Sequence, residues 1–280
     1  MQLVQGEGVG SASGHRATPT RTYLLRFALA LVVPLLLFVA FLFYESASRE
    51  RSRVEQRALT LALHISRIVD SELSQRIALL DGLAASQALL EGDFERFQRE
   101  AQRAAPASEV IILRELGPRQ YVNTGVEWGQ PLPDGIPMTE QQQALLRAGQ
   151  PYVGNVYAAP RDGEVRVVVA RSVLVKGETR VLGLTMPTEK ILKVVLENGT
   201  PGWVIGIGDA VGNYVTRSSQ HEEVTGRPGL DSYLKSAQAH SGTFYLDNVR
   251  GRPILAGYVK SPFSQWLYAA NIDYAEVLAP

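Results

Sequence analysis

An uncharged apolar run of eighteen residues, from Phe27 to Tyr44, constrains this sequence more than any other feature. A helix of this length spans about 27 Å, close to the thickness of the hydrocarbon core of a bilayer. Pro34 in the middle of the run would break a helix in water but is tolerated in a membrane span. A signal peptide has a shorter apolar region and a small-x-small cleavage site, which the residues after Tyr44 match poorly. We therefore expect residues 22–44 to form an uncleaved transmembrane helix.

The charge balance and the missing cysteines narrow the functional classes. The 280 residues carry 28 Lys and Arg against 28 Asp and Glu, so nothing indicates a nucleic-acid partner. The absence of cysteine excludes disulfides, thiolate nucleophiles and Cys-ligated metals. Residues 1–21 are rich in Gly, Ser and Thr and are predicted to be a disordered cytoplasmic tail. Arginines flank the span on both sides, so this orientation rests on the ease with which a large folded domain is translocated.

A long amphipathic helix is predicted after the apolar run. Between residues 45 and 90, apolar side chains recur every three or four positions, most clearly from Leu61 to Ile77, and no proline interrupts them. Such a helix is too long for the core of one small domain and indicates a stalk. Its apolar stripe could pack on the chain's own domains, on a second copy of the helix, or on both. Asp93 is predicted to cap a short second helix, so that this region ends at residue 104.

Beyond residue 104 the apolar period falls to about two, and the pattern of elements occurs twice. Residues 105–199 and 200–280 both show the order strand, strand, helix, strand, strand, strand, and the segment from Tyr121 to Thr124 matches the one from Tyr214 to Arg217. The fold class is therefore α+β, with two antiparallel sheets after the stalk. Each sheet is expected to carry helices on one face and a loop-covered concavity on the other.

Turn and cap residues predict the borders of these elements. Asp162-Gly163 and Lys176-Gly177 are typical of tight hairpin turns. Thr139 and Gln142 have the spacing of a capping box, which predicts a helix from Thr139 to Ala148. Thr188 is predicted to cap the helix that connects the two repeats.

Several short motifs follow one another in a characteristic order. They are Glu91-Gly92-Asp93-Phe94-x-x-Phe97, Val122-Asn123-Thr124, Pro131-Leu132-Pro133, Pro201-Gly202-Trp203-Val204, Asp209-x-x-Gly212 and Ser261-Pro262-x-Ser264-x-Trp266. With the span and the long helix before them, they resemble the double Cache sensor domains, made of tandem PAS-like units, of bacterial sensor histidine kinases. The resemblance covers residues 45–280. The sequence departs from it at Arg114-Glu115-Leu116, where an acidic turn is expected, and at Gln265, where glycine is expected.

The resemblance implies that residues 105–199 form the membrane-distal unit and residues 200–280 the membrane-proximal one. It implies a small-molecule sensor in the bacterial inner membrane, with its sensor domain in the periplasm and a homodimer formed through the stalk helix. The chain would be the input half of a two-component histidine kinase, truncated before its second span and transmitter. The input domain of a chemoreceptor or a cyclase-type receptor is one alternative. A membrane-anchored adhesion or scaffold module without a ligand is another.

An enzyme is not expected. The glycines at positions 206, 208 and 212 follow a strand, but a second strand comes after them where a dinucleotide loop would open a helix. His221, Glu222, Glu223 and His240 lack the spacing that places two imidazoles on one face of a helix. We predict no catalytic activity, no cofactor and no metal for this chain.

Alternation along the strands of the first repeat predicts a ligand pocket. The candidate binding residues are Tyr121, Asn123, Tyr152, Tyr157, Arg166 and Arg171. Aromatic walls with a few polar anchors are the usual composition of a small-molecule site. Because arginine can hold a carboxylate through two hydrogen bonds, an organic acid is the expected ligand. The alternative is that both arginines lie on the solvent face of the sheet.

Overall fold

The computed structural model describes residues 20–229, 231–248 and 251–273, which divide between two compact units with their border after residue 51. The disordered tail predicted for residues 1–21 lies outside this part except for its last two residues. The C-terminal residues 274–280 lie outside it as well.

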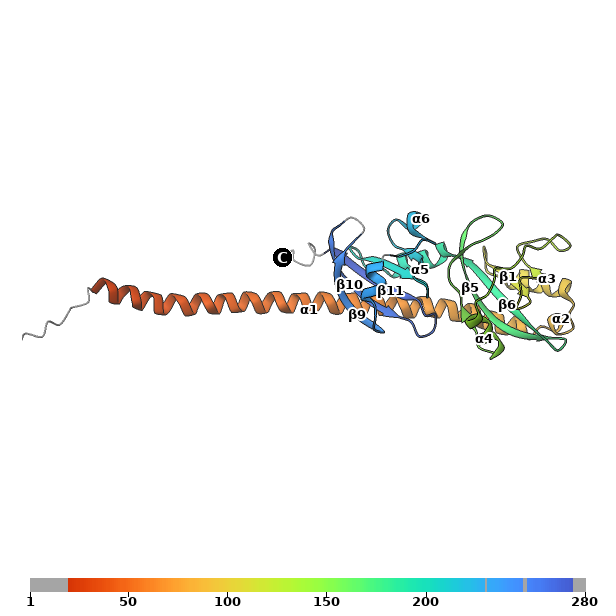
Figure 1. Ribbon diagram of the computed structural model, residues 1–280, viewed down its shortest axis with the longest axis horizontal. Coiled ribbons are helices and arrows are strands. Elements are labelled where there is room, and N and C mark those ends of the chain that lie inside the picture. Colours follow the sequence, from red (N-terminus) through yellow and green to blue (C-terminus); the bar gives the residue numbers. More distant parts are fainter. Residues whose placement is uncertain (1–19, 230, 249–250, 274–280) are drawn as a thin grey trace, which may run out of the picture. The chain divides into compact units, whose positions relative to one another are not determined.

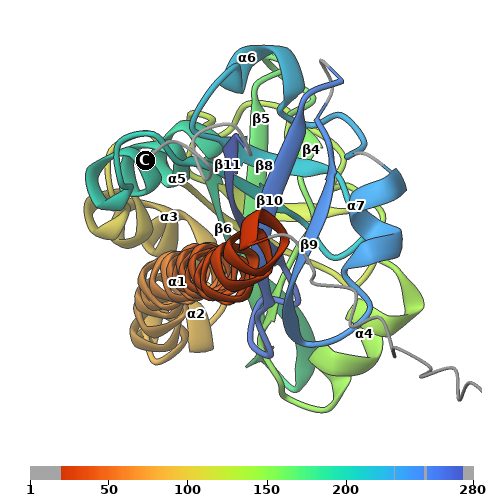
Figure 2. The same cartoon turned by 90° about the vertical axis from the view of Figure 1, so that its left-hand side faces the viewer.

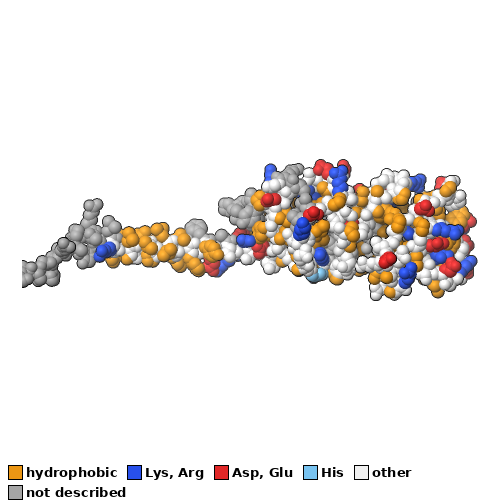
Figure 3. Space-filling model, viewed as in Figure 1, with side chains coloured by type: hydrophobic (Ala, Val, Ile, Leu, Met, Phe, Trp, Pro, Cys, Tyr) orange, Lys and Arg blue, Asp and Glu red, His pale blue; other side chains and the backbone are white. Residues whose placement is uncertain are grey.

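One helix makes up the described part of the first unit. Helix α1 (Thr20–Ala84) contains Pro34 and continues into the second unit. Large apolar side chains between Leu24 and Leu42 are exposed, and Figure 3 shows hydrophobic side chains along this stretch. Among the described residues, we find no helix that combines the length and the apolarity required of a membrane span. The transmembrane helix at residues 22–44 stays a prediction.

Two short helices follow α1. They are α2 (Gln87–Leu90) and α3 (Phe94–Ala104). The single helix predicted to run to residue 90 ends earlier because Ser86 starts a new one, its hydroxyl accepting the Leu89 amide at 3.4 Å. The predicted cap of α3 is confirmed, since Asp93 Oδ1 accepts the Arg96 amide at 3.0 Å.

The first sheet is antiparallel throughout and has the strand order β2-β1-β6-β5-β3, with β4 paired to β5 as well. Its strands are β1 (Val110–Arg114), β2 (Gln120–Asn123), β3 (Tyr152–Val153), β4 (Tyr157–Ala158), β5 (Val165–Val175) and β6 (Glu178–Pro187). Helix α4 (Glu140–Arg147) lies between β2 and β3 in the chain, and its predicted capping box is present. The turn between β5 and β6 is also confirmed, because Lys176 and Gly177 both have positive φ angles, 50° and 81°.

The second sheet repeats this topology. Helix α5 (Thr188–Asn198) leads into it, and its strand order is β8-β7-β11-β10-β9. The strands are β7 (Val204–Gly208), β8 (Tyr214–Arg217), β9 (Ser241–Asp247), β10 (Pro253–Lys260) and β11 (Leu267–Asp273), with α6 (His221–Val224) and α7 (Asp231–Ser236) between β8 and β9. The predicted duplication and the α+β class with two antiparallel sheets are confirmed.

The predicted cap at Thr188 is wrong. Pro187 occupies the cap position and has no side-chain acceptor, while Thr188 is the first residue of α5. The Thr188 side chain is fully buried, and its hydroxyl donates to the Val165 carbonyl oxygen at 3.3 Å. The hydroxyl therefore ties α5 to β5.

The apolar stripe of α1 packs on the chain's own sheets. Ile65, Val69 and Leu73 are at most 1% exposed and belong to one core with Leu184 of the first sheet and Trp266 next to the second. Figure 1 shows both sheets along the C-terminal half of α1, and Figure 2 shows α1, α3 and α5 together on one side of them. The opposite faces of the sheets are therefore left to loops, α4 and α7.

Two of the contacts between α1 and the second sheet are specific to the residue types involved. A Cβ atom on Gly257 of β10 would lie 2.5 Å from the carbonyl carbon of Ala58, so only glycine permits this approach of strand to helix. Further along α1, the Asp70 carboxylate accepts hydrogen bonds from Ser261, Ser264 and Tyr268. The Ser261–Trp266 motif thus joins the β10–β11 turn to the stalk.

Candidate ligand-binding site

A cavity of about 520 Å³ lies on the face of the first sheet that does not pack on α1. It is of a size that holds a small organic molecule. Strands β1, β2, β5 and β6 provide one wall, and the loops around α4 and β4 provide the other. Its lining includes Ile112, Arg114, Gln120, Asn123, Tyr152, Tyr157, Arg166, Val168, Ala170 and Thr185.

Strand alternation separates the cavity from the core. On β1, Ile112 and Arg114 line the cavity, whereas Ile111 and Leu113 are fully buried in the core with α1. Strands β5 and β6 alternate in the same way. Each strand therefore contributes one row of side chains to the core and one to the site.

Four of the six predicted binding residues line this cavity. Asn123 comes from β2, Tyr152 from β3, Tyr157 from β4 and Arg166 from β5. Arg166 Nη1 donates to the Ser108 carbonyl oxygen at 3.2 Å, and the guanidinium also pairs with Glu164. The structure therefore brings these four side chains together, and their contact with a ligand stays a prediction.

Tyr121 lies outside the cavity because of a β-bulge. Leu113 pairs with Val122 and Arg114 pairs with Gln120, so Tyr121 is an extra residue in β2. The bulge turns the Tyr121 ring away from the cavity, against Phe94 at 5.3 Å between ring centroids. The expectation that Tyr121 and Asn123 share a face is wrong for this reason.

Arg171 lies on the other face of β5. It is five positions from Arg166, and an odd separation puts two side chains of a regular strand on opposite faces. Its guanidinium pairs with Asp81 of α1 and its Nε donates to the Ser172 carbonyl oxygen at 3.3 Å. The placement of Arg171 in the pocket was therefore wrong.

Arg114 is the missed cavity residue that bears most on ligand chemistry. Its Nε and Nη2 donate to the Gly117 carbonyl oxygen at 3.1 and 2.8 Å, and its Nη1 donates to that of Ile136 at 2.7 Å. One N–H on each of Nη1 and Nη2 is left over. No carboxylate of the described residues forms an ion pair with Arg114. A signal was present in the sequence, since Arg114 stands where the resemblance expects an acidic turn.

Burial shapes the acid–base properties of the cavity. It raises the pKa of Tyr152 to about 12 and also raises that of Tyr157, while the Arg114 charge opposes both shifts. Both phenols are therefore protonated at neutral pH and can donate hydrogen bonds. Burial lowers the pKa of Arg114, but an arginine keeps its charge at neutral pH. The cavity thus places the Arg114 charge beside two neutral hydroxyls, and Arg161 and Arg166 also belong to its lining.

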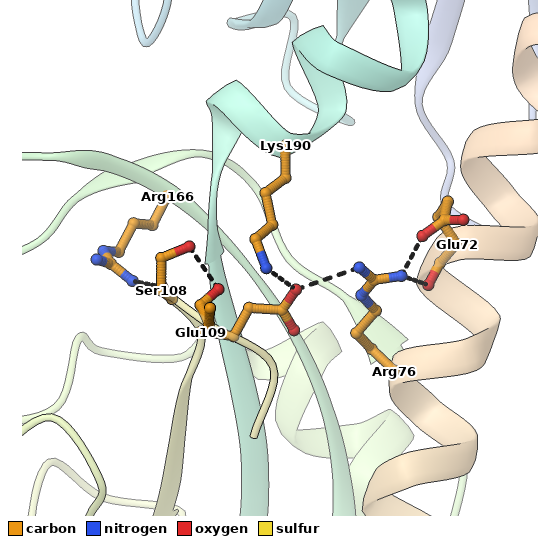
Figure 4. A network of polar contacts seen from close by, with 7 residues as sticks. Glu72, Arg76, Ser108, Glu109, Arg166 and Lys190 are labelled. Carbon is orange, nitrogen blue, oxygen red and sulfur yellow. Dashed lines mark hydrogen bonds and ion pairs between the residues drawn. The ribbon is translucent and has the colours of Figure 1, made fainter. Parts of the chain in front are cut away.

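A buried ionic cluster joins the cavity to two helices (Figure 4). Glu109, which lines the cavity just before β1, has a fully buried side chain. Its Oε1 accepts from Arg76 Nη2 of α1 at 3.2 Å and from Lys190 Nζ of α5 at 2.8 Å. Burial lowers the pKa of Arg76, but Glu109 and Glu72 outweigh it and the net shift is upward. This Glu109 cluster connects the first sheet, the stalk and α5, the helix that leads into the second sheet.

His221 has an acidic neighbour, since Glu189 Oε1 lies 3.7 Å from its Nε2. Within the described ranges no group of three or more His, Asp or Glu side chains is arranged to hold a metal ion. His221 Nδ1 instead lies 2.9 Å from the Thr216 hydroxyl and 3.0 Å from the Thr225 hydroxyl.

No family model and no curated protein sequence matches this chain. Solved structures do share its fold. An extracellular domain assigned to a histidine kinase, rpHK1S-Z16, superposes with a TM-score of 0.60 at 13% identity, covering 81% of this chain and 98% of the other. The periplasmic sensory domain of the Campylobacter jejuni chemoreceptor Tlp1 gives 0.62 at 11% identity, covering 82% and 99%.

A third structure is the ligand-binding domain of the Pseudomonas aeruginosa amino acid chemoreceptor PctB in complex with L-arginine. Its TM-score is 0.59 at 15% identity, and the match covers 82% of this chain and 99% of that domain. Because these matches span nearly all of each neighbour, the likeness concerns the whole two-sheet fold. The chain therefore has the fold of these sensory domains.

Proposed function

We propose that this chain, which has the double Cache fold, is the input domain of a membrane-bound receptor and binds a small organic anion in the cavity of the first sheet. The observation that carries the proposal is that cavity, with Arg114 unpaired by any described carboxylate. The role assigned to the chain is binding, with no reaction. A sensor histidine kinase is the favoured receptor class and a chemoreceptor the second candidate, because both occur among the neighbours in fold.

The cavity chemistry supports an anionic ligand. Arg114 is held by backbone carbonyl oxygens, so its guanidinium is positioned before a ligand arrives. A carboxylate could take the remaining N–H groups in charge-assisted hydrogen bonds. The neutral Tyr152 and Tyr157 hydroxyls could donate to the same anion, while Val168 and Ala170 offer apolar contact.

The Glu109 cluster suggests how binding could reach the stalk. Glu109 contacts the cavity on one side and both Arg76 of α1 and Lys190 of α5 on the other. A ligand that favours one packing of the first sheet would shift the population of α1 positions. Helix shifts of about 1–2 Å are typical of such transitions.

The ligand proposal predicts a dependence on Arg114. With the full chain in nanodiscs, a panel of carboxylates with three to six carbons should contain a compound that raises the thermal midpoint. Arg114→Gln should weaken that compound's binding by about thirtyfold or more, because the variant loses a charge-assisted pair worth roughly 2 kcal/mol. Isothermal titration calorimetry measures both affinities.

Arg171→Gln provides the control, since Arg171 lies on the opposite face of the sheet. Its affinity should stay within about twofold of the wild type. The anion proposal fails if the corresponding amide binds as tightly as the carboxylate, or if the two variants lose affinity equally. If no compound of any class binds, the adhesion or scaffold alternative gains support.

We further propose that residues 22–44 anchor the chain in the bacterial inner membrane, with the sheets in the periplasm, and that two chains pair through α1. The exposed apolar side chains from Leu24 to Leu42 support the anchor, because such a surface is unfavourable in water. The pairing would use the side of α1 opposite the buried stripe, where Arg67, Ser71 and Ser74 are exposed.

Both points are tested on liposomes. The wild-type chain should float with the vesicles, and arginines at positions 31, 35 and 38 should abolish flotation, because each costs about 3 kcal/mol in a bilayer. Arginines at the exposed apolar residues Leu174, Leu196 and Val211 should leave flotation intact.

The chain has no native cysteine, so Arg67→Cys and Ser71→Cys should form disulfide dimers in the floated fraction. Flotation of the triple-arginine variant refutes the anchor, and monomers alone refute the pairing.

A further inference from the structure

The second sheet carries a cavity of its own, of about 240 Å³. It lies among strands β7, β8 and β11 and helix α7. Its lining includes Val204, Gly206, Gly208, Tyr214, Arg217, Tyr233, Ile254, Leu267, Ala269, Asn271 and Asp273.

The strand registers show that the two cavities are equivalent. Ile112 of β1 pairs with Asn123 on one side and Gly183 on the other. In the second sheet, Gly206 of β7 pairs with Arg217 and Ala269 in the same way. Arg217 therefore occupies the position that Asn123 occupies in the first cavity. Both cavities lie on the face of their sheet that does not pack on α1.

The two sheets carry different side chains at equivalent positions, and these differences shape the second cavity. Gly206 and Gly208 stand where the first sheet has Ile112 and Arg114, so the floor of the cavity is bare backbone. A Cβ atom on Gly206 would lie 3.8 Å from the nearest heavy atom, which belongs to the Tyr214 ring, so a larger side chain has room there. Tyr258 replaces Ala170 at the equivalent position of β10, and its larger ring packs against Phe244 at 5.4 Å between centroids.

Arg217 supplies the positive charge of this cavity. Its Nη1 donates to Gln220 Oε1 at 2.7 Å, and no ion pair joins it to a carboxylate of the described residues. Asp273 is the acidic residue of the lining. Ala269 lies in the same row across the sheet as Gly206 and Arg217, and Asp273 is four positions beyond Ala269, about 14 Å along β11. Asp273 also has Arg252 within 3.8 Å. The Arg217 charge is therefore not neutralised from that side.

The remaining polar groups are fixed in place. The Tyr233 hydroxyl donates to Asn271 Oδ1, and Asn271 Nδ2 donates to the Val204 carbonyl oxygen at 3.1 Å. Burial raises the pKa values of Tyr214 and Tyr233, which keeps both phenols neutral. The cavity thus combines one cation, two aromatic rings and a glycine floor.

We propose that this second cavity binds a small monocarboxylate, with the carboxylate on Arg217 and a short aliphatic body over Gly206 between Tyr214 and Tyr233. The volume has room for a molecule of the size of propionate. This site is separate from the cavity of the first sheet, so the chain would respond to two ligands.

Propionate is the probe and propionamide its neutral match. Titration calorimetry on the full chain in nanodiscs should show that propionate binds at least about tenfold more tightly than propionamide. Arg217→Gln should weaken the binding of propionate by about tenfold or more because the positive charge is lost. Gly206→Val should weaken it as much because the added side chain occupies the space above the glycine backbone. Arg114→Gln, in the first cavity, should leave this affinity unchanged.

Three results would overturn the proposal. The first is that titration of the wild-type chain with propionate gives no binding heat. The second is that both Arg217→Gln and Gly206→Val bind propionate as tightly as the wild type does. The third is affinity lost only in Arg114→Gln, which would place propionate in the first cavity and support the proposed function alone. Gly206→Val keeps both side chains of the Arg217–Gln220 contact, so it reports on the cavity even if Arg217→Gln fails to fold.

Discussion

Replacing Asp70 with alanine is expected to lower the free energy of unfolding by about 4 kcal/mol. The Asp70 carboxylate accepts from Ser261 Oγ at 2.7 Å, Ser264 Oγ at 3.0 Å and the Tyr268 hydroxyl at 3.1 Å. These three residues are at most 1% exposed, so water cannot replace the lost acceptor. A buried hydroxyl without a partner costs about 1–3 kcal/mol. Urea unfolding followed by circular dichroism measures the difference.

The charge state of Tyr268 makes this contact robust. Burial, and then the neighbouring carboxylate, raise the pKa of Tyr268 well above its ordinary value. The phenol therefore stays protonated and donates to Asp70. Asp70→Asn keeps one acceptor oxygen, so its free energy of unfolding should lie between those of the wild type and Asp70→Ala.

Asp81→Ala is the matched control on the same helix. Asp81 pairs with Arg171, and the two side chains are 52% and 30% exposed. Exposed pairs contribute at most about 1 kcal/mol, so the control should be nearly neutral. If Asp70→Ala costs no more than Asp81→Ala, the carboxylate does not hold the second sheet to α1.

The order of elements was predictable because it depends on local signals. Hairpin residues such as Lys176-Gly177 and the capping box at Thr139 fix turns and helix starts within a few positions. The duplication followed from repeated local patterns. The Asp70 contacts could not be predicted, because Asp70 and Ser261 are 191 positions apart in the chain. Nothing in the helical pattern distinguished Asp70 from other acidic residues on the polar side of the stalk.

The site was predictable only as far as strand alternation holds. Asn123, Tyr152, Tyr157 and Arg166 were correctly expected to gather in one place. Strict use of strand alternation would have excluded Arg171 from the predicted binding residues, because it is an odd number of positions from Arg166.

The prediction that placed Tyr121 in the cavity failed for a different reason, a β-bulge. It arises in the pairing between β1 and β2, and the sequence of β2 alone does not show it. The same shift puts Gln120 opposite Arg114, so Gln120 and Asn123 both line the cavity. Finding Arg114 required treating its departure from the double Cache resemblance as a signal in its own right.

Glu109→Gln is expected to lower the free energy of unfolding by about 3 kcal/mol. The Glu109 side chain has no exposure, and Arg76 is only 16% exposed. Removing the negative charge leaves Arg76 with Glu72 as its ionic partner, and Lys190 loses its ionic partner. A buried charge that loses one of its two ionic partners is costly, whereas the 30% exposed Lys190 can turn towards water. Arg76 therefore accounts for most of the expected loss.

Glu197→Gln on α5 is the control for Glu109→Gln. Glu197 and Lys193 are 60% and 76% exposed and 3.8 Å apart, so this pair should contribute less than about 0.5 kcal/mol. Hydrogen exchange adds a second readout, because Glu109 is the shared partner of α1 and α5. Amides near Arg76 and Lys190 should exchange faster in Glu109→Gln and not in Glu197→Gln. Equal stability of the two variants, with unchanged exchange in both helices, would mean that the Glu109 cluster does not join the cavity to the stalk.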